Sequence, residues 1–174
     1  MRPHGDASFT RFQRMLLGTD GTVTHVLEAY AGEPVEVVKL HQELSLPQAT
    51  DAELELSAEE KVLRRRVLIK TVQTDRTLLY AEATVVVMRV EPAVLDGLVS
   101  TDKPIGILLA EHRVETFREI LRVGRELAGP TSAYFGMEPD AELVARTYRI
   151  VHRGRPMILI TEKFPLTSFR AVTA

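Results

Sequence analysis

Val62-Leu63-Arg64-Arg65-Arg66-Val67-Leu68-Ile69-Lys70 begins the strongest strand signal in the chain, which runs over residues 62–72 and resumes over residues 78–90. Apolar and β-branched side chains recur in both runs with the period of two that is typical of a β-strand. The polar residues 73–77 between the runs suit a hairpin connection. We therefore expect two long antiparallel strands in this part of the chain.

A second hairpin is predicted near the end of the sequence, over residues 145–152 and 156–164. Its turn, Arg153-Gly154-Arg155, contains a glycine that can adopt a positive φ angle. Residues 34–44 predict a further strand, followed by a polar loop over residues 45–57.

Apolar residues at helical spacing predict a helix that ends at Gly18, a second helix over residues 23–32 and a third over residues 114–121. Pro92 and Pro104 each predict the start of a turn or short helix. Strands toward both ends of the chain with helices between them indicate an α+β fold, a single antiparallel sheet flanked by helices.

Size and charge limit the kind of partner. With 174 residues, of which 45% are hydrophobic, the chain is long enough for one well-packed domain, which we expect to span residues 1–174. The 22 Lys and Arg residues nearly balance the 24 Asp and Glu residues. No overall field attracts nucleic acid or an anionic membrane, so we expect a small-molecule partner.

The sequence contains no cysteine, which excludes a disulfide framework, a thiolate nucleophile and a zinc-thiolate site. The first eight residues lack the apolar core of a secretory signal, and no apolar run approaches membrane-spanning length. We expect a cytoplasmic protein.

The common catalytic motifs are missing. The sequence has no Gly-x-Ser-x-Gly elbow, phosphate-binding glycine loop or dinucleotide fingerprint. At helical spacing, His112, Glu115 and Glu119 share a face that metal ligands could use, but Arg118 and Arg122 are interleaved with them. Such a set is usually a solvated face with ion pairs, so we expect neither a metal site nor a cofactor.

Two charged residues fall on faces where an apolar side chain would be expected. Alternation places Arg65 on one face of its strand with Leu63, Val67 and Ile69, and places Arg64 and Arg66 on the other face. Glu162 likewise shares its face with Ile158, Ile160 and Phe164. A buried charge costs several kcal/mol unless it is paired or meets a ligand.

Two interpretations of these charges remain open at this point. In the first, Arg65 and Glu162 form a buried salt bridge or extend to solvent at the rim of the sheet. In the second, they face a pocket, where Arg65 binds an anionic group and Glu162 accepts a hydrogen bond or a proton.

Several blocks of the sequence, taken together in their order and spacing, resemble the chorismate pyruvate-lyase family. The similar blocks are Leu17–Glu28, Val62–Ile69, Leu79–Glu82, Lys103–Gly106 with Glu115–Glu119, and Tyr148–Phe164. The resemblance implies an antiparallel sheet flanked by helices, with helical flaps over a buried ligand site. It also implies conversion of chorismate to 4-hydroxybenzoate and pyruvate without a cofactor.

The resemblance also implies roles for particular residues. The carboxylate-binding arginine of the family corresponds to Arg65, and its carboxylate near the ring hydroxyl corresponds to Glu162. The turn at Val23 and the turn Pro104-Ile105-Gly106-Ile107 correspond to backbone regions whose amides help to hold the ligand. Alternation along the strands had already singled out Arg65 and Glu162.

Two alternatives differ in the function that they imply. The first is a sibling lyase that acts on a modified or isomeric enolpyruvyl ether. The second is a non-catalytic sensor, because the same fold is similar to the effector-binding UTRA domain of bacterial transcription factors. Such a sensor usually needs a DNA-binding domain, for which 174 residues leave no room beside this fold.

Overall fold

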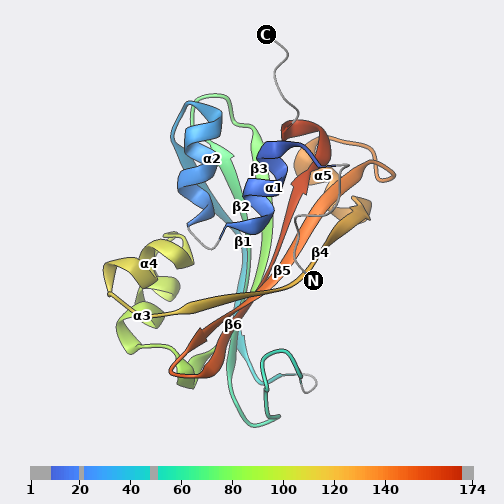
Figure 1. Cartoon of the computed structure of the whole chain (residues 1–174). Coiled ribbons are helices and arrows are strands. Elements are labelled where there is room, and N and C mark those ends of the chain that lie inside the picture. Colours follow the sequence, from blue (N-terminus) through green and yellow to red (C-terminus); the bar gives the residue numbers. More distant parts are fainter. Residues whose placement is uncertain (1–8, 20–21, 48–50, 170–174) are drawn as a thin grey trace.

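A computed structural model describes residues 9–19, 22–47 and 51–169 of the chain (Figure 1). The described residues form a six-stranded sheet in the order β1-β2-β3-β6-β5-β4, in which all neighbouring strands are antiparallel. The strands are β1 (Val35–Ser45), β2 (Val62–Thr71), β3 (Thr77–Val86), β4 (Phe117–Leu127), β5 (Glu142–His152) and β6 (Arg155–Pro165). The helices are α1 (Arg11–Gly18), α2 (Val23–Ala31), α3 (Pro92–Ser100), α4 (Ile105–Glu111) and α5 (Ser132–Phe135), with short 3-10 turns η2 (Val87–Arg89), η3 (Gly129–Thr131) and η4 (Leu166–Phe169).

The two faces of the sheet are covered differently. Helices α1 to α4 pack on one face, where α1 and α2 lie toward one end of the strands and α3 and α4 toward the other (Figure 1). On the opposite face, Tyr134 of α5 stacks on Tyr80 of β3 with ring centroids 5.5 Å apart. Leu54 and Leu56, from the segment after β1, also pack on this face. The predicted α+β architecture is thus confirmed.

Both predicted hairpins are confirmed. β2 pairs with β3, and β5 pairs with β6 around a tight turn in which Arg153 and Gly154 have φ angles of 50° and 76°. Two successive positive φ angles match the right-handed twist of the flanking strands. Gly32 ends α2 with a φ of 70°, and its N–H donates to the carbonyl of Glu28 at 2.9 Å, so this helix ends where the sequence predicts.

The predicted helix over residues 114–121 is wrong. Residues 117–127 form the edge strand β4, which pairs with β5 and has a bulge between Ile120 and Arg122. Before the bulge, Arg118 and Ile120 face the helix-covered side of the sheet, and after it Val123 does. The bulge thus puts Ile120 and Val123, three residues apart, on the same side of the strand. A spacing of three between apolar residues is also typical of a helix. The helical face that His112, Glu115 and Glu119 would have shared is therefore absent, since Glu119 instead pairs with Arg149 on β5 at 2.7 Å.

Other elements follow the prediction more closely. The predicted strand over residues 34–44 is β1, and the short helices expected near Pro92 and Pro104 are α3 and α4. The first eight residues, and Asp20 and Gly21 of the family-like block, lie outside the described residues. No helix in the described chain combines the length and the apolar character needed to span a bilayer.

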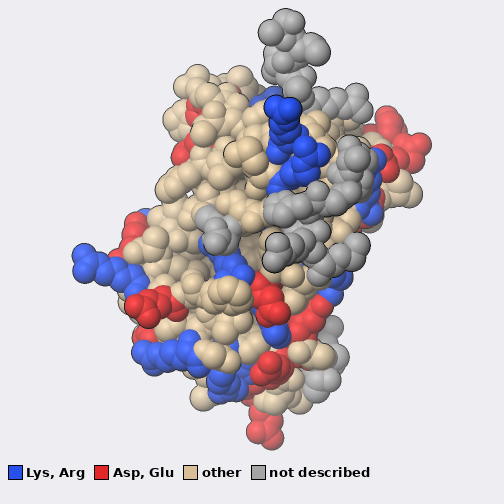
Figure 2. Space-filling model, in the orientation of Figure 1, with Lys and Arg blue, Asp and Glu red and all other residues tan. Residues whose placement is uncertain are grey.

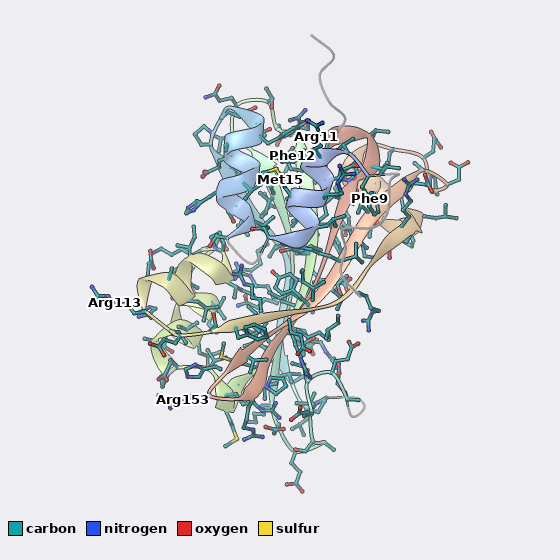
Figure 3. The ribbon with its side chains drawn as sticks, in the orientation of Figure 1. Phe9, Arg11, Phe12, Met15, Arg113 and Arg153 are labelled. Carbon is teal, nitrogen blue, oxygen red and sulfur yellow. The ribbon has the colours of Figure 1, made fainter. Side chains whose placement is uncertain are left out.

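Aromatic packing fixes α1 and α2 on the sheet. Phe12, labelled on α1 in Figure 3, stacks on Tyr30 of α2 with ring centroids 4.4 Å apart and lies 5.5 Å from the ring of Phe169. Leu16 and Leu27 from the same helices are fully buried against the sheet. Burying each such leucine contributes about 1.5–3 kcal/mol, which helps to hold α1 and α2 on the sheet.

Acidic and basic side chains are mixed over the face of the molecule in Figure 2, as the balanced composition suggests. The upper left of that face, over α2, is mainly uncharged. The largely uncharged surface over α2 adjoins a pocket that lies beneath α2 and α4.

Candidate active site

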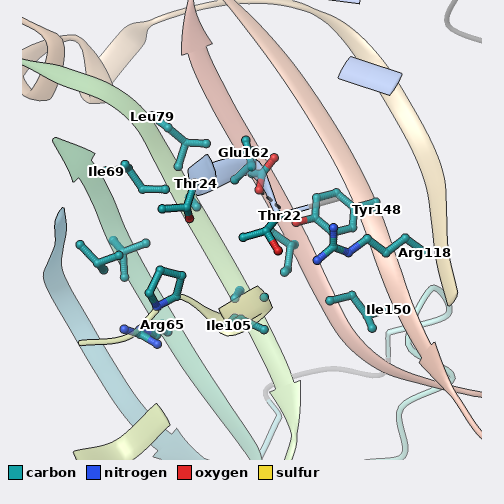
Figure 4. A pocket seen from close by; sticks show the side chains of 18 residues that line it. Thr22, Thr24, Arg65, Ile69, Leu79, Ile105, Arg118, Tyr148, Ile150 and Glu162 are labelled. Carbon is teal, nitrogen blue, oxygen red and sulfur yellow. Dashed lines mark hydrogen bonds between the residues drawn. The ribbon is translucent and has the colours of Figure 1, made fainter. Parts of the chain in front are cut away.

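A pocket with about 620 Å³ of atom-free space, part of it open to solvent, lies between the helix-covered face of the sheet and the N-terminal ends of α2 and α4 (Figure 4). A concave, mostly apolar wall with a few polar groups is typical of a small-molecule site. Most of its wall is apolar and comes from Val23, Val37, Val67, Ile69, Leu79, Ala81, Ala83, Pro104, Ile105, Ile150 and Ile160. The polar lining consists of Thr22, Thr24, Arg65, Gly106, Arg118, Tyr148 and Glu162.

The pleat of the sheet builds this wall. Alternate residues of a strand point to the same face, so β2 contributes Arg65 and Val67 while Arg64 and Arg66 face away. Arg65 is only 3% exposed, and Arg66 is exposed. The predicted register of the arginine run is therefore confirmed.

Arg65 is buried without a full set of hydrogen-bond partners. Its Nη1 donates to the carbonyl of Lys103 at 3.1 Å, whereas its Nε and Nη2 are buried and have no partner in the described part of the chain. Burial lowers the pKa of Arg65, and the nearby carboxylate of Asp102 partly offsets this effect. Leaving charged donors buried and unpaired is costly, and an anionic ligand would satisfy them.

Glu162 has a different environment, because two side chains of β5 already bind it. Arg146 Nε donates to its Oε2 at 2.6 Å, and the Tyr148 hydroxyl donates to its Oε1 at 3.0 Å. Arg146 Nη1 also donates to the carbonyls of Leu16 at 2.6 Å and Thr19 at 3.0 Å. These contacts fix the position of the carboxylate and compensate its charge.

Tyr148 connects this ion pair to the pocket. Burial, followed by the negative charge of Glu162, raises the pKa of the Tyr148 hydroxyl, so that it stays protonated and can donate. The guanidinium carbons of Arg146 and Arg118 lie 5.1 and 5.8 Å from the centre of its ring. Such distances allow cation–π attraction.

The N-terminal ends of α2 and α4 approach each other at the pocket. An added Cβ at Gly106 would come within 3.2 Å of Thr22 Oγ1 and 3.3 Å of Arg118 Nη2, so the absence of a side chain permits this close approach. The first backbone bonds of the helices run from His25 N to Thr22 O and from Ile107 N to Pro104 O. The N–H groups of Val23 and Thr24 in α2, and of Ile105 and Gly106 in α4, come before these bonds. Groups at these positions have no carbonyl partner within their own helix.

The segment before α4 is tied to the sheet. Lys39 of β1 forms an ion pair with Asp102 at 3.1 Å, and Arg65 of β2 donates to the carbonyl of Lys103. Arg65 therefore contacts both the pocket and the segment that covers it.

The structure brings most of the predicted site residues together. Arg65, Glu162, Val23, Ile105 and Gly106 all line the pocket. The predicted Ile107 is not among the lining residues of the described chain, and its N–H bonds to Pro104.

The salt-bridge interpretation of the two charged residues is wrong, because Glu162 pairs with Arg146 and not with Arg65. The alternative in which both charges reach solvent at the rim is also wrong, since each residue is 3% exposed.

Three further residues of the site, Arg146, Tyr148 and Arg118, were not predicted from the sequence. The first two share one face of β5 with Val144 and Ile150, so the test that singled out Arg65, a charge on an apolar strand face, would also have found Arg146. Arg118 was hidden by its assignment to a helix, where it seemed to belong to a solvated face.

Solved structures with the same fold include ligand-binding domains of transcriptional regulators. The effector domain of PhnF from Mycobacterium smegmatis has a TM-score of 0.65 and 12% identity, and the match covers 83% of this chain and 88% of that one. The ligand-binding domain of a putative GntR-family regulator from Bordetella bronchiseptica has a TM-score of 0.59 and 20% identity, over 75% and 82% of the two chains. At these identities the likeness shows the fold class alone, an α+β architecture.

Sequence relatives give the family within that class. Residues 15–171 match the model of the Rv2949c-like chorismate pyruvate-lyase family, and the chain belongs to this family. The chorismate pyruvate-lyase of Mycobacterium leprae is 31% identical over 158 residues, which cover 90% of this chain and 75% of the relative. A putative lyase of Methanocaldococcus jannaschii is 27% identical, over 87% and 77% of the two chains.

Proposed function

We propose that this protein is a lyase that converts chorismate to 4-hydroxybenzoate and pyruvate. Family membership supports the reaction class. The observation that carries the proposal is the apolar pocket in which Arg65 has two buried nitrogens without partners and Glu162 presents a fixed carboxylate. One cation and one hydrogen-bond acceptor match the ring carboxylate and the ring hydroxyl of this substrate.

The chemistry places modest demands on the protein. The C3–O bond to the enolpyruvyl group breaks, C4 loses its hydrogen, and the new C3–C4 double bond completes the aromatic ring. The hydrogen is gained by the methylene carbon of the departing group, which leaves as pyruvate. Atoms and electrons balance without an external oxidant or reductant, so orientation and exclusion of water can supply most of the catalysis.

Arg65 binds the ring carboxylate in this proposal. Its Nε and Nη2, which have no partner in the described chain, are neighbouring nitrogens of one guanidinium. Together they can donate two parallel hydrogen bonds to the two oxygens of a carboxylate. The N–H groups in the first turns of α2, at Val23, and α4, at Ile105 and Gly106, add donors beside it.

Glu162 accepts a hydrogen bond from the C4 hydroxyl. Each oxygen of the carboxylate already accepts one bond, and each retains a lone pair for a further donor. The hydrogen bonds from Arg146 and Tyr148 hold the carboxylate in place, so Glu162 can fix the position of the ring. In this proposal the aliphatic side chains of β2, β3 and β6 that line the pocket pack against the ring.

The assay is direct. Purified protein is incubated with chorismate, 4-hydroxybenzoate is followed by ultraviolet absorbance and chromatography, and pyruvate is followed by coupling to lactate dehydrogenase. We expect the two products in equal amounts, at a rate above that of spontaneous chorismate decay. Arg65→Ala protein serves as the control for contaminating lyase.

Other outcomes would identify the alternatives. Turnover of an isomeric or modified enolpyruvyl ether, but not of chorismate, would indicate a sibling lyase. Tight binding of an aromatic or cyclohexadiene acid without turnover of any such ether would indicate an effector-binding module, a function that the shared fold with regulator domains makes physically reasonable.

A further inference from the structure

We propose that Arg118 binds the second carboxylate of the substrate, the one on the enolpyruvyl side chain, and thereby selects the substrate over the product. This inference rests on the proposed function and deepens it.

Arg118 enters the pocket from the opposite wall to Arg65. Three strands separate β2 from β4 in the sheet, and Figure 4 shows the two arginines on opposite sides of the pocket. The Arg118 guanidinium lies 5.8 Å from the ring centre of Tyr148, whose hydroxyl binds Glu162. Arg118 is therefore on the Glu162 side of the pocket.

The polar groups of the substrate are arranged in the same way as those of the pocket, with one carboxylate at one end and the hydroxyl and the second carboxylate at the other. Its ring carboxylate, on C1, is para to the C4 hydroxyl, whereas the enolpyruvyl ether is on C3, directly beside that hydroxyl. A ring held by Arg65 at C1 and by Glu162 at C4 must place its second carboxylate on the Glu162 side. Arg118 is the cation that lines this side in the described chain.

The charged groups of the described lining support the same assignment. They are Arg65, Arg118 and Glu162. Glu162 pairs with Arg146 from within the fold, with side-chain exposures of 4% for Glu162 and 1% for Arg146. The two arginines of the lining correspond in number to the two carboxylates of the substrate.

Gly106 explains how Arg118 can reach this position. An added Cβ there would lie 3.3 Å from Arg118 Nη2, tighter than a usual carbon contact, so a larger residue would displace the guanidinium. The same glycine places the backbone at the start of α4 next to Arg118.

Loss of pyruvate removes the second carboxylate, so chorismate carries this group and 4-hydroxybenzoate does not. A residue that binds the second carboxylate should therefore affect the binding of chorismate only. We would measure KM for chorismate and the Kd for 4-hydroxybenzoate with Arg118→Met, Arg118→Lys and the wild-type protein. For Arg118→Met we expect KM to rise at least about tenfold, as when one member of a buried charge pair is lost, while Kd for 4-hydroxybenzoate changes less than about threefold. Arg118→Lys keeps the charge but not the planar donor pair, so its KM for chorismate should lie between the values of the wild type and of Arg118→Met.

Arg122→Met is the matched control, since Arg122 is on the same strand but pairs with Glu53 and lies opposite Thr147, on the other face of the sheet. We expect its KM and Kd to match the wild-type values. An unchanged KM in Arg118→Met protein that is still folded, or an equal loss of affinity for chorismate and 4-hydroxybenzoate, would overturn the role of Arg118. Wild-type protein that makes no 4-hydroxybenzoate would instead overturn the proposed function, and the relative binding of the two ligands would still decide the role of Arg118.

Discussion

Arg146 and Glu162 face each other directly across the pairing of β5 and β6, and Arg146 Nε lies 2.6 Å from Glu162 Oε2. Both side chains are almost completely buried. Each residue therefore depends on the other, because removing one leaves an uncompensated charge inside the protein. The carboxylate that faces the pocket is part of the structural core as well as of the site.

The first prediction concerns this dependence. Arg146→Met or Glu162→Met alone should lower the free energy of unfolding by about 3–5 kcal/mol, the usual cost of breaking a buried ion pair. The double variant replaces both charges by apolar groups, so it should lose much less than the sum of the single losses. Urea unfolding of the four proteins measures the coupling. Strictly additive losses would show that the pair is not energetically coupled.

The second prediction separates catalysis from binding at Glu162. Glu162→Gln keeps a group that can form hydrogen bonds but removes the negative charge. Measured below its unfolding temperature, the variant should lose kcat for chorismate by a larger factor than it loses affinity for 4-hydroxybenzoate. Glu119→Gln, on the edge strand β4, is the control and should leave kcat unchanged. A Glu162→Gln enzyme with wild-type kcat would contradict the proposed role.

The third prediction compares two neighbouring arginines. Arg65→Ala should weaken ligand binding by roughly 2–5 kcal/mol, because the ligand carboxylate loses a buried charged partner. Arg66→Ala should change binding by less than about 0.5 kcal/mol, since Arg66 is exposed and points away from the pocket. Isothermal titration with 4-hydroxybenzoate gives both values. The opposite order would mean that Arg65 is not the anion-binding residue.

The stability of an Arg65 variant provides a further check on this prediction. The unliganded protein buries two Arg65 nitrogens without partners, and burial lowers the pKa of the side chain. Arg65→Met should therefore unfold at a temperature equal to or higher than that of the wild type, although it loses activity. A large loss of stability would indicate that Arg65 has a structural role.

The fourth prediction concerns alkaline pH. The pKa of Tyr148 is raised in the folded protein, so its contribution to stability is fully present below about pH 10, the unfolded tyrosine pKa, and is lost as the pH rises above it. Above that pH, Tyr148→Phe should lose stability less steeply than the wild type, by up to about 1.4 kcal/mol per pH unit. Urea unfolding from pH 8 to 11.5 tests this. Parallel curves would show that Tyr148 ionises normally.

The fifth prediction uses the product as a probe. At about a hundred times its Kd, 4-hydroxybenzoate should stabilise the native protein by about 2.7 kcal/mol. Benzoate at the same concentration should stabilise it less, because it lacks the hydroxyl that Glu162 accepts. The difference between the two ligands in a thermal shift experiment should shrink in Glu162→Ala. If 4-hydroxybenzoate leaves the melting temperature unchanged while another cyclic acid raises it, the substrate assignment fails.

Local periodicity was enough to predict four of the strands in the two hairpins, and it also placed Arg65 and Glu162 on the buried face. The reason is that a pleated strand turns every second side chain to the same side, whatever the strand pairs with. The same rule failed at β4, where the bulge between Ile120 and Arg122 interrupts the alternation. As an edge strand, β4 also carries charged residues that suit an exposed helix equally well.

The sequence by itself determined which residues alternate, which strand faces are apolar and where charges interrupt them, because these properties depend on neighbours in the chain. Only the tertiary structure decided that Glu162 pairs with Arg146, that Arg65 retains donors for a ligand and that Arg118 enters the pocket opposite Arg65. These relationships depend on strand order and register across the sheet. Contacts between segments distant in sequence set that order and register, so no local pattern contains them.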